Sequence, residues 1–149
     1  MTMRWFIASL HLLALPLGLG AVWMRGRALS VVRGAEDLDR TFVADNLWGL
    51  AAVLWLATGL LRAFGGLEKG ATYYLHDRAF YVKMGLFVTI LALEILPMTT
   101  LIRWRLAVRR GTSVDTTAAP SLARISQIQA ALVVLMVFAA TAVARGLFY

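Results

Sequence analysis

Four long apolar stretches constrain this chain more than any other feature of its sequence. Each holds about the 20 residues that a helix needs to cross a lipid bilayer, and the four cover approximately Trp5–Met24, Phe42–Phe64, Phe80–Leu101 and Ile125–Phe148. Hydrophobic residues make up 60% of the chain and charged residues 15%, whereas a soluble domain is about a quarter charged. We therefore predict an all-α, integral membrane four-helix bundle in which all 149 residues form a single transmembrane domain.

Residues at the ends of the stretches support this interpretation. The first stretch continues to Arg25 and Arg27 without the small-residue cleavage site of a signal peptide, so we expect it to remain as a helix. Aromatic side chains, which favour the interface between lipid and water, stand at most of the ends: Trp5, Trp23, Phe64, Phe80, Tyr81, Trp104 and Tyr149.

The distribution of basic residues predicts the orientation of the spans. The two odd-numbered connections and their flanks are the more basic side, and this side normally faces the cytoplasm. We therefore predict a bacterial inner-membrane protein with both termini in the periplasm. The net charge of +7 then reflects contacts with anionic lipid headgroups, and we expect no nucleic-acid partner. The more basic side holds Arg25, Arg27, Arg33 and Arg40, which we assign to the first loop, and Arg103, Arg105, Arg109, Arg110 and Arg124 in the third loop and its flanks. The other side holds Arg4, Arg62, Lys69, Arg78, Lys83 and Arg145.

Two ionisable residues in the third stretch, Lys83 and Glu94, require a specific explanation. A charged side chain near the bilayer centre costs about 2.5–3.5 kcal/mol on insertion scales. The spacing of the two residues places them on one helix face, with a rise of about 16 Å between them. Since this is too far for an ion pair, each is expected to find a partner on another helix. Lys83 also lies near enough to the interface to extend its ammonium group to water.

The depth of other polar residues suggests where those partners lie. With the orientation above, His11 lies at about the depth of Lys83, near the outer face. Asp45 and Asn46 lie at about the depth of Glu94, near the inner face. We therefore predict two polar layers inside the bundle, because intramembrane ionisable groups usually face the protein and mark functional sites.

Several interpretations of individual residues stay open. Arg40 or Arg103 would balance the acids of the inner layer. Asp45 alternatively serves only to stabilise the helix N-terminus near which it stands. His11 alternatively is a packed and hydrogen-bonded imidazole, and His76 is expected to be an exposed or interfacial loop residue.

Several kinds of site are absent from the sequence. The chain has no cysteine, which excludes disulfides, thiolate zinc sites and iron–sulfur ligation. It also lacks the common phosphate-binding, zinc-protease and serine-hydrolase motifs. No pair of histidines has a spacing suited to a metal, so His11 is the one metal-ligand candidate within the spans.

Four segments resemble a family of predicted bacterial multi-span membrane proteins of unknown function. The resemblance implies a small multi-span fold and no established activity, and it covers about two thirds of the chain. The segments are "WFIASLHLLALPLGLGAVWMRGRAL", "ADNLWGLAAVLWLATGL", "GLEKGATYYLHDRAFYVKMGLF" and "LEILPMTTLIRWR".

A more distant similarity points to the HemJ-type protoporphyrinogen oxidases and to copper-resistance membrane proteins. It rests on a histidine early in the first span, a basic loop and an aromatic-x-x-lysine start to the third span. The resemblance implies that His11 and Lys83 are essential and that heme b is bound, with His11 as the iron ligand. The chain departs from that pattern where Glu94 stands in place of a further histidine, and in "RTFVADNLWG" of the second span.

Three classes of function follow from these observations. The first is an intramembrane polar site of the HemJ type, with His11 and Lys83 binding a cofactor and Lys83, Glu94 and Asp45 as candidate catalytic residues. The second is a transporter that relays protons or a small cation through the same groups. The third is a non-catalytic accessory subunit of a larger membrane complex, or a homo-oligomer, in which the polar residues only fix the helix register.

Overall fold

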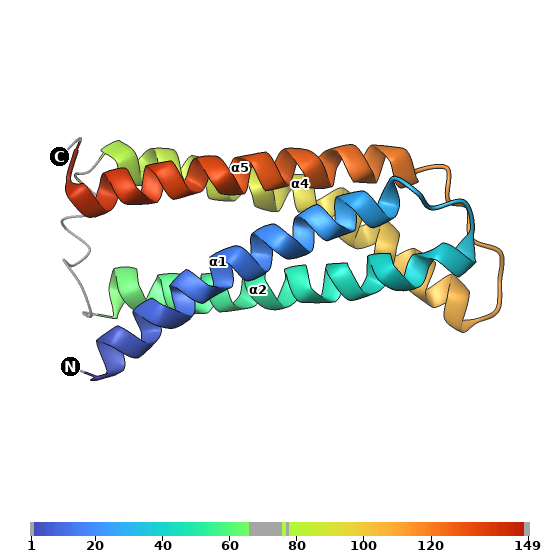
Figure 1. Ribbon diagram of the computed structural model, residues 1–149, viewed down its shortest axis with the longest axis horizontal. Helices are drawn as coiled ribbons and strands as arrows, with labels where there is room; N and C mark the ends of the chain where they lie inside the picture. The colour runs from blue at the N-terminus through green and yellow to red at the C-terminus, as the bar shows by residue number, and fades with distance from the viewer. Residues whose placement is uncertain (1, 66–75, 77, 148–149) are drawn as a thin grey trace.

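The structure is a computed structural model that describes residues 2–65, 76 and 78–147. No strand occurs in this part of the chain, and four helices in it are long and apolar enough to cross a membrane. The predicted all-α bundle of four membrane helices is therefore confirmed. The elements are α1 (Thr2–Leu29), the short 3-10 helix η1 (Ala35–Asp37), α2 (Leu38–Phe64), α4 (Arg78–Arg109) and α5 (Ala119–Arg145) (Figure 1).

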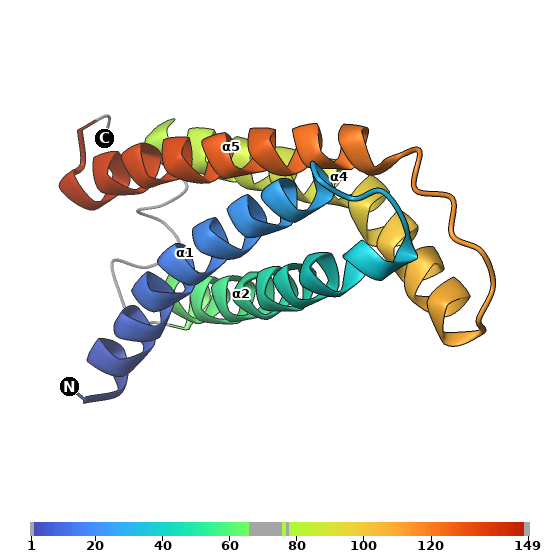
Figure 2. The same ribbon diagram turned by 45° about the vertical axis from the view of Figure 1, so that its right-hand side comes forward.

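The helices are arranged around α1 and α5. α1 packs against α2 and α5, and α4 packs against α5. The start of α1 and the end of α5 lie at the same end of the bundle, opposite the connections 30–34 and 110–118 (Figure 1). The C-terminal half of α4 turns away from α5 (Figures 1 and 2) and reaches α2, where Arg105 lies over the ring of Phe42. Pro97, inside α4, removes one backbone hydrogen bond and permits this change of direction.

The apolar core consists of two clusters along the bundle. The first cluster surrounds Trp48 and Trp55 of α2, and the second surrounds Trp104 of α4. On α1, Val22 belongs to the first cluster and Leu29 to the second. The buried face of α1 therefore contacts the first cluster at Val22 and the second at Leu29. The buried polar residues lie between the two clusters, at the depth of Arg25.

Two glycines of α1 allow its neighbours to approach closely. A Cβ atom added at Gly18 would lie 3.3 Å from the Cβ of Ala51, on α2. A Cβ atom added at Gly26 would lie 3.2 Å from the Cβ of Ser126, on α5, and 3.4 Å from the carbonyl oxygen of Ala123. Small residues at such crossings favour helix association in lipid, where packing drives assembly.

The first helix is longer than the apolar stretch that predicted it. α1 continues beyond Met24 to Leu29, so Arg25 and Arg27 belong to the helix and not to the connection after it. Arg25 is buried and Arg27 is exposed. Assigning both arginines to a loop was therefore wrong, because the buried face of the helix extends through Arg25 to Leu29.

The helix α4 also extends past its apolar stretch. It continues beyond Leu101 to Arg109, so Arg103 and Arg105 are helical residues. Trp104 is buried in this extension and belongs to the second apolar cluster. Because Trp104 is packed in the core, the helix is fixed at this turn, and Arg103 and Arg105 have defined positions on it.

Candidate functional site

A fully buried arginine lies at the centre of the polar level. Arg25 follows Val22 on the buried face of α1, and its side chain is 0% exposed. An arginine keeps its charge in proteins, so its burial requires counter-charges and hydrogen-bond acceptors around all of its donors. The other helices supply these groups.

Every N–H group of the Arg25 guanidinium has an acceptor. A guanidinium has five N–H donors, one on Nε and two on each Nη atom. Nε donates to the Ser126 hydroxyl at 3.1 Å, and Nη1 donates to Asp45 at 2.8 Å and to Glu94 at 2.7 Å. Nη2 donates to Glu94 at 2.8 Å and to the Gln129 amide oxygen at 2.8 Å. The contact with Glu94 is therefore bidentate, which fixes both the distance and the orientation of the two groups.

Glu94 is the second centre of the site. Besides the two bonds from Arg25, its carboxylate accepts the indole N–H of Trp48 at 3.0 Å and the amide N–H of Gln129 at 2.8 Å. Gln129 also donates to the carbonyl oxygen of Ile90 at 3.2 Å. The Arg25 guanidinium lies 5.9 Å from the ring centroid of Trp48, within the range of a cation–π contact. These bonds connect α1, α2, α4 and α5 in one network.

Asp45 joins the buried arginine to a second arginine nearer the surface. One carboxylate oxygen of Asp45 accepts from Arg25, and the other accepts from Nη2 of Arg105 at 2.9 Å. Arg105 also donates to the carbonyl oxygen of Phe42 at 3.1 Å, and its guanidinium lies 4.7 Å from the Phe42 ring centroid. Asp45 thus bridges two cations from two different helices.

We call the set Arg25, Asp45, Glu94 and Arg105 the ion network. Its two guanidinium and two carboxylate groups balance in formal charge. The side-chain exposure rises from 0% at Arg25 to 19% at Asp45 and Glu94 and 25% at Arg105. The ion network therefore runs from the centre of the bundle toward its edge.

The structure brings together two of the residues that the sequence indicated for the inner polar layer. Asp45 and Glu94 contact the same guanidinium, although they come from α2 and α4. Asn46, which was expected in the same layer, is exposed. On a helix, the residue after a buried-facing position is turned by about 100°, which places Asn46 outside the site.

The predicted counterions of the inner layer were wrong. Arg40 is exposed, and Arg103 is exposed with its guanidinium on the Thr100 hydroxyl at 3.4 Å. Arg25 and Arg105 take the role instead, because they lie on the helix faces that point at the two acids. The signal for Arg25 was its position one turn after the buried residues Ala21 and Val22 of α1. Arg105 had the corresponding signal, because it stands one turn after the buried residue Leu101 of α4.

His11 lies apart from the ion network, where α1 meets α2. Its Nδ1 atom is 2.8 Å from the hydroxyl oxygen of Thr58. The same hydroxyl is also hydrogen-bonded to the carbonyl oxygen of Leu54, one turn earlier on α2. The ring centroid of His11 lies 6.5 Å from that of Trp55.

The remaining sequence candidates have simpler surroundings. Lys83 is half-buried on α4. His76 is exposed, as expected, but it has helical backbone structure and so its assignment to a loop was wrong. Within the described ranges, no group of three or more histidine, aspartate or glutamate side chains could hold a metal ion.

Four apolar helices joined by a buried ion network define a small multi-pass membrane protein. The model of one protein family, described as "Predicted membrane protein (DUF2214)", matches residues 3–147. The chain belongs to this family. The expectation of a predicted membrane protein family of unknown function is therefore confirmed.

The other comparisons add no relative. No match was found among curated proteins or among solved structures. The description of the family names no activity, and the similarity to the HemJ-type oxidases is not shown by any of the comparisons.

Proposed function

We propose that the protein is a non-catalytic membrane scaffold, an accessory component that acts through the shape it presents to lipid and to other membrane proteins. The observation that carries this proposal is the complete use of the Arg25 donors within a charge-balanced set. A buried polar network of this kind fixes one arrangement of helices when every member is satisfied.

The geometry explains how the ion network would define the scaffold. Arg25 comes from α1, Asp45 from α2, Glu94 from α4 and Ser126 from α5. A shift of one helix by one residue moves its side chains by about 1.5 Å and turns them by about 100°. Such a shift breaks bonds at Arg25, so each helix has one preferred depth and rotation.

The same geometry favours a scaffold over a proton relay. A relay group must gain and lose a proton while its surroundings adapt. The Glu94 carboxylate already accepts four N–H bonds, two of them from the guanidinium. Protonation of Glu94 would place a hydrogen atom among these donors and would leave Arg25 beside a single carboxylate, that of Asp45.

The proposed orientation places the ion network in the cytoplasmic half of a bacterial inner membrane. The basic connections 30–34 and 110–118 lie at one end of the bundle, and the ends of α1 and α5 nearest the termini lie at the other (Figure 1). Both termini are then periplasmic under the positive-inside rule. The ion network lies nearer the basic end, since Arg25 is one turn from the end of α1.

A flux experiment distinguishes the scaffold from a transporter. The wild-type protein and the Glu94→Gln variant are reconstituted in liposomes that contain a pH-sensitive dye, and a proton gradient is imposed. We expect both to collapse the gradient no faster than empty liposomes, because the carboxylate has only a structural task. Proton flux in the wild type that falls at least tenfold in Glu94→Gln would exclude the scaffold.

A second candidate function rests on the position of His11. Its Nδ1 atom is hydrogen-bonded to the Thr58 hydroxyl, and a histidine oriented through one ring nitrogen is a common axial ligand of heme iron through the other. The side chain therefore has the chemistry for one axial position of a heme. Lys83, half-buried on α4, would balance a heme propionate. Bound heme b would supply a one-electron redox centre.

An absorption spectrum tests this second candidate. If His11 binds heme b, protein purified in mild detergent, or mixed with hemin, shows a Soret band that the His11→Ala variant lacks. Thr58→Val, which removes the hydroxyl bonded to Nδ1, should weaken hemin binding by a smaller factor of about 10–100. If the protein shows no Soret band after unbound hemin has been removed, this candidate is excluded and the scaffold is unaffected.

A further inference from the structure

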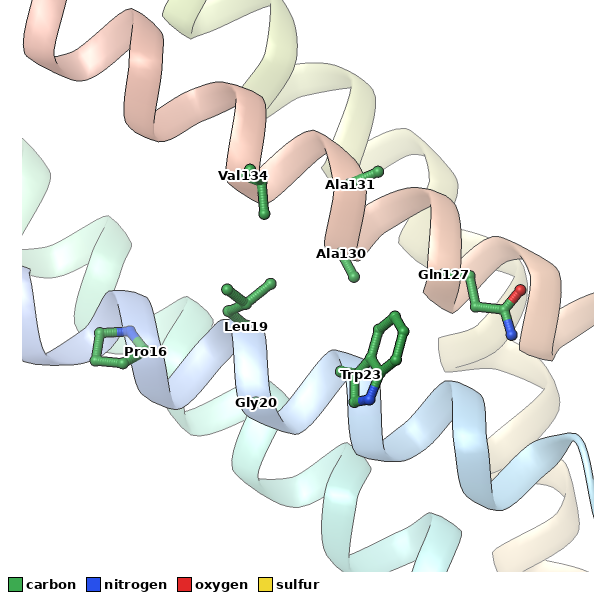
Figure 3. Close-up of a pocket in the computed structure, with 8 residues that line it drawn as sticks. All are labelled: Pro16, Leu19, Gly20, Trp23, Gln127, Ala130, Ala131 and Val134. Atoms are coloured by element: carbon green, nitrogen blue, oxygen red, sulfur yellow. The ribbon is translucent and has the colours of Figure 1, made fainter.

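An apolar groove lies on the outside of the bundle between α1 and α5. Its volume is about 580 Å³, and its walls include Leu19, Gly20 and Trp23 of α1 and Ala130 and Val134 of α5 (Figure 3). We call it the α1–α5 groove. Its side chains are small or apolar, with Gln127 of α5 near Trp23 as the polar member (Figure 3).

The groove has a closed end and an open end. The two helices touch at Gly26, where an added Cβ would lie 3.2 Å from Ser126. From there α1 and α5 diverge toward the N-terminal end of α1 (Figures 1 and 2). The space between them widens over Trp23, Gly20 and Pro16, which line the groove in that order. A groove of this shape opens toward the middle of the bilayer.

Two arginines stand beyond the closed end, toward the basic connections. Arg27 follows Trp23 by four residues on α1, and Arg124 precedes Gln127 by three residues on α5. Residues three or four apart lie on the same helix face, so both arginines continue the faces that form the groove. Both arginines are exposed. The groove thus runs from apolar walls at membrane depth to two positive charges at the interface.

We propose that the α1–α5 groove is a binding site for one anionic phospholipid of the leaflet at the basic end. An acyl chain fills the apolar wedge, because an open groove at this depth faces hydrocarbon and has no water to fill it. The phosphate lies between Arg27 and Arg124, and the amphipathic indole of Trp23 lies at headgroup level. This site does not depend on how the ion network is used.

The charges favour a lipid over a second membrane helix as the occupant. Small residues such as Gly20 and Ala130 would also admit a helix. A helix would have to bring an acidic residue to Arg27 and Arg124 at the interface. Every anionic phospholipid carries its negative charge at the depth of the interface, and its acyl chain fits the apolar part of the groove.

The first test compares lipids of different headgroup charge. Purified wild-type protein in detergent is titrated with phosphatidylglycerol or with phosphatidylcholine of the same chains, and bound lipid is counted by native mass spectrometry. We expect one phosphatidylglycerol to be retained at concentrations where phosphatidylcholine is not. The double variant Arg27→Gln/Arg124→Gln should bind phosphatidylglycerol about 30-fold more weakly, which corresponds to ~2 kcal/mol for two surface arginines.

Matched variants separate this site from general attraction. Arg109→Gln/Arg110→Gln removes the same charge from two exposed residues elsewhere at the basic end and should bind phosphatidylglycerol as the wild type does. Equal losses in both double variants would overturn the proposal, since they would show attraction to overall charge. Equal retention of the two lipids by the wild type would overturn it as well.

A second variant tests the apolar part of the groove. A Cβ atom added at Gly20 or at Gly49 would meet no atom within 4 Å, so both Gly20→Leu and Gly49→Leu can fold. Gly20→Leu fills the groove and should lose the retained phosphatidylglycerol, whereas Gly49→Leu, on α2, should keep it. If Gly20→Leu instead separates a dimer of the wild type into monomers with lipid binding unchanged, the groove is an interface between copies and the proposal is wrong.

Discussion

Replacing Arg25 by methionine is expected to lower the free energy of unfolding by about 3–5 kcal/mol, the usual cost of removing one partner from a buried ion pair. Methionine fills similar space but leaves Glu94 without a cation, and Ser126 and Gln129 lose a donor. The free energy is measured by unfolding the protein in mixed micelles with increasing dodecyl sulfate. Tryptophan fluorescence reports the transition, because Trp48 contacts both Arg25 and Glu94.

Two further variants show whether the loss comes from the ion network. Arg109→Met, at an exposed position near the end of α4, should change the free energy of unfolding by less than about 0.5 kcal/mol. Arg25→Met combined with Glu94→Met removes both charges, so part of the loss should be recovered. Recovery is incomplete because the indole N–H of Trp48 loses its acceptor. A single Arg25→Met variant as stable as the wild type would contradict the ion network.

The fold was predictable because the bilayer imposes a simple rule on the sequence. A spanning segment must satisfy its own backbone and expose apolar side chains, so helix number follows from the hydropathy alone. The ends of the helices do not follow from it. α1 and α4 continue to Leu29 and Arg109, past the apolar stretches, and Leu29 and Trp104 in these extensions belong to the apolar core.

The two acids of the site, Asp45 and Glu94, could be predicted from the sequence. The same argument did not identify the buried arginine, Arg25. Asp45 and Glu94 were recognised because an unbalanced charge inside a membrane is costly. Arg25 was assigned to a connection, since an arginine next to an apolar stretch usually marks its end. The evidence against this lay in the periodicity, because Ala14, Gly18 and Arg25 share the buried face of α1.

Depth along the membrane normal was a weaker guide than helix rotation. Asn46 was grouped with Asp45 and Glu94 because it lies at similar depth, yet its side chain is exposed. Rotation of each helix is set by close contacts such as those at Gly18, where a Cβ would be 3.3 Å from Ala51. Such contacts involve pairs of small residues on two helices, and one sequence contains no record of which residues pair.

The second large effect is expected at Gly26, where α1 touches α5. A leucine side chain there has no space, because its Cβ alone would lie 3.2 Å from Ser126 and 3.4 Å from the carbonyl oxygen of Ala123. We expect Gly26→Leu to lower the free energy of unfolding by about 1–3 kcal/mol, the usual cost of overpacking. Gly26→Ala should cost less, and Gly49→Leu, whose Cβ would meet no atom within 4 Å, is the matched control.

The cost at Gly26 should be coupled to the ion network. Arg25 precedes Gly26, and its Nε atom bonds to the hydroxyl of the same Ser126 that an added Cβ would approach. Pushing α1 away from α5 therefore also lengthens the contact between Arg25 and Ser126. Residues that share a partner are not additive, so Gly26→Leu should cost less in an Arg25→Met background than in the wild type. Equal costs in the two backgrounds would show that the helix contact and the ion network are independent.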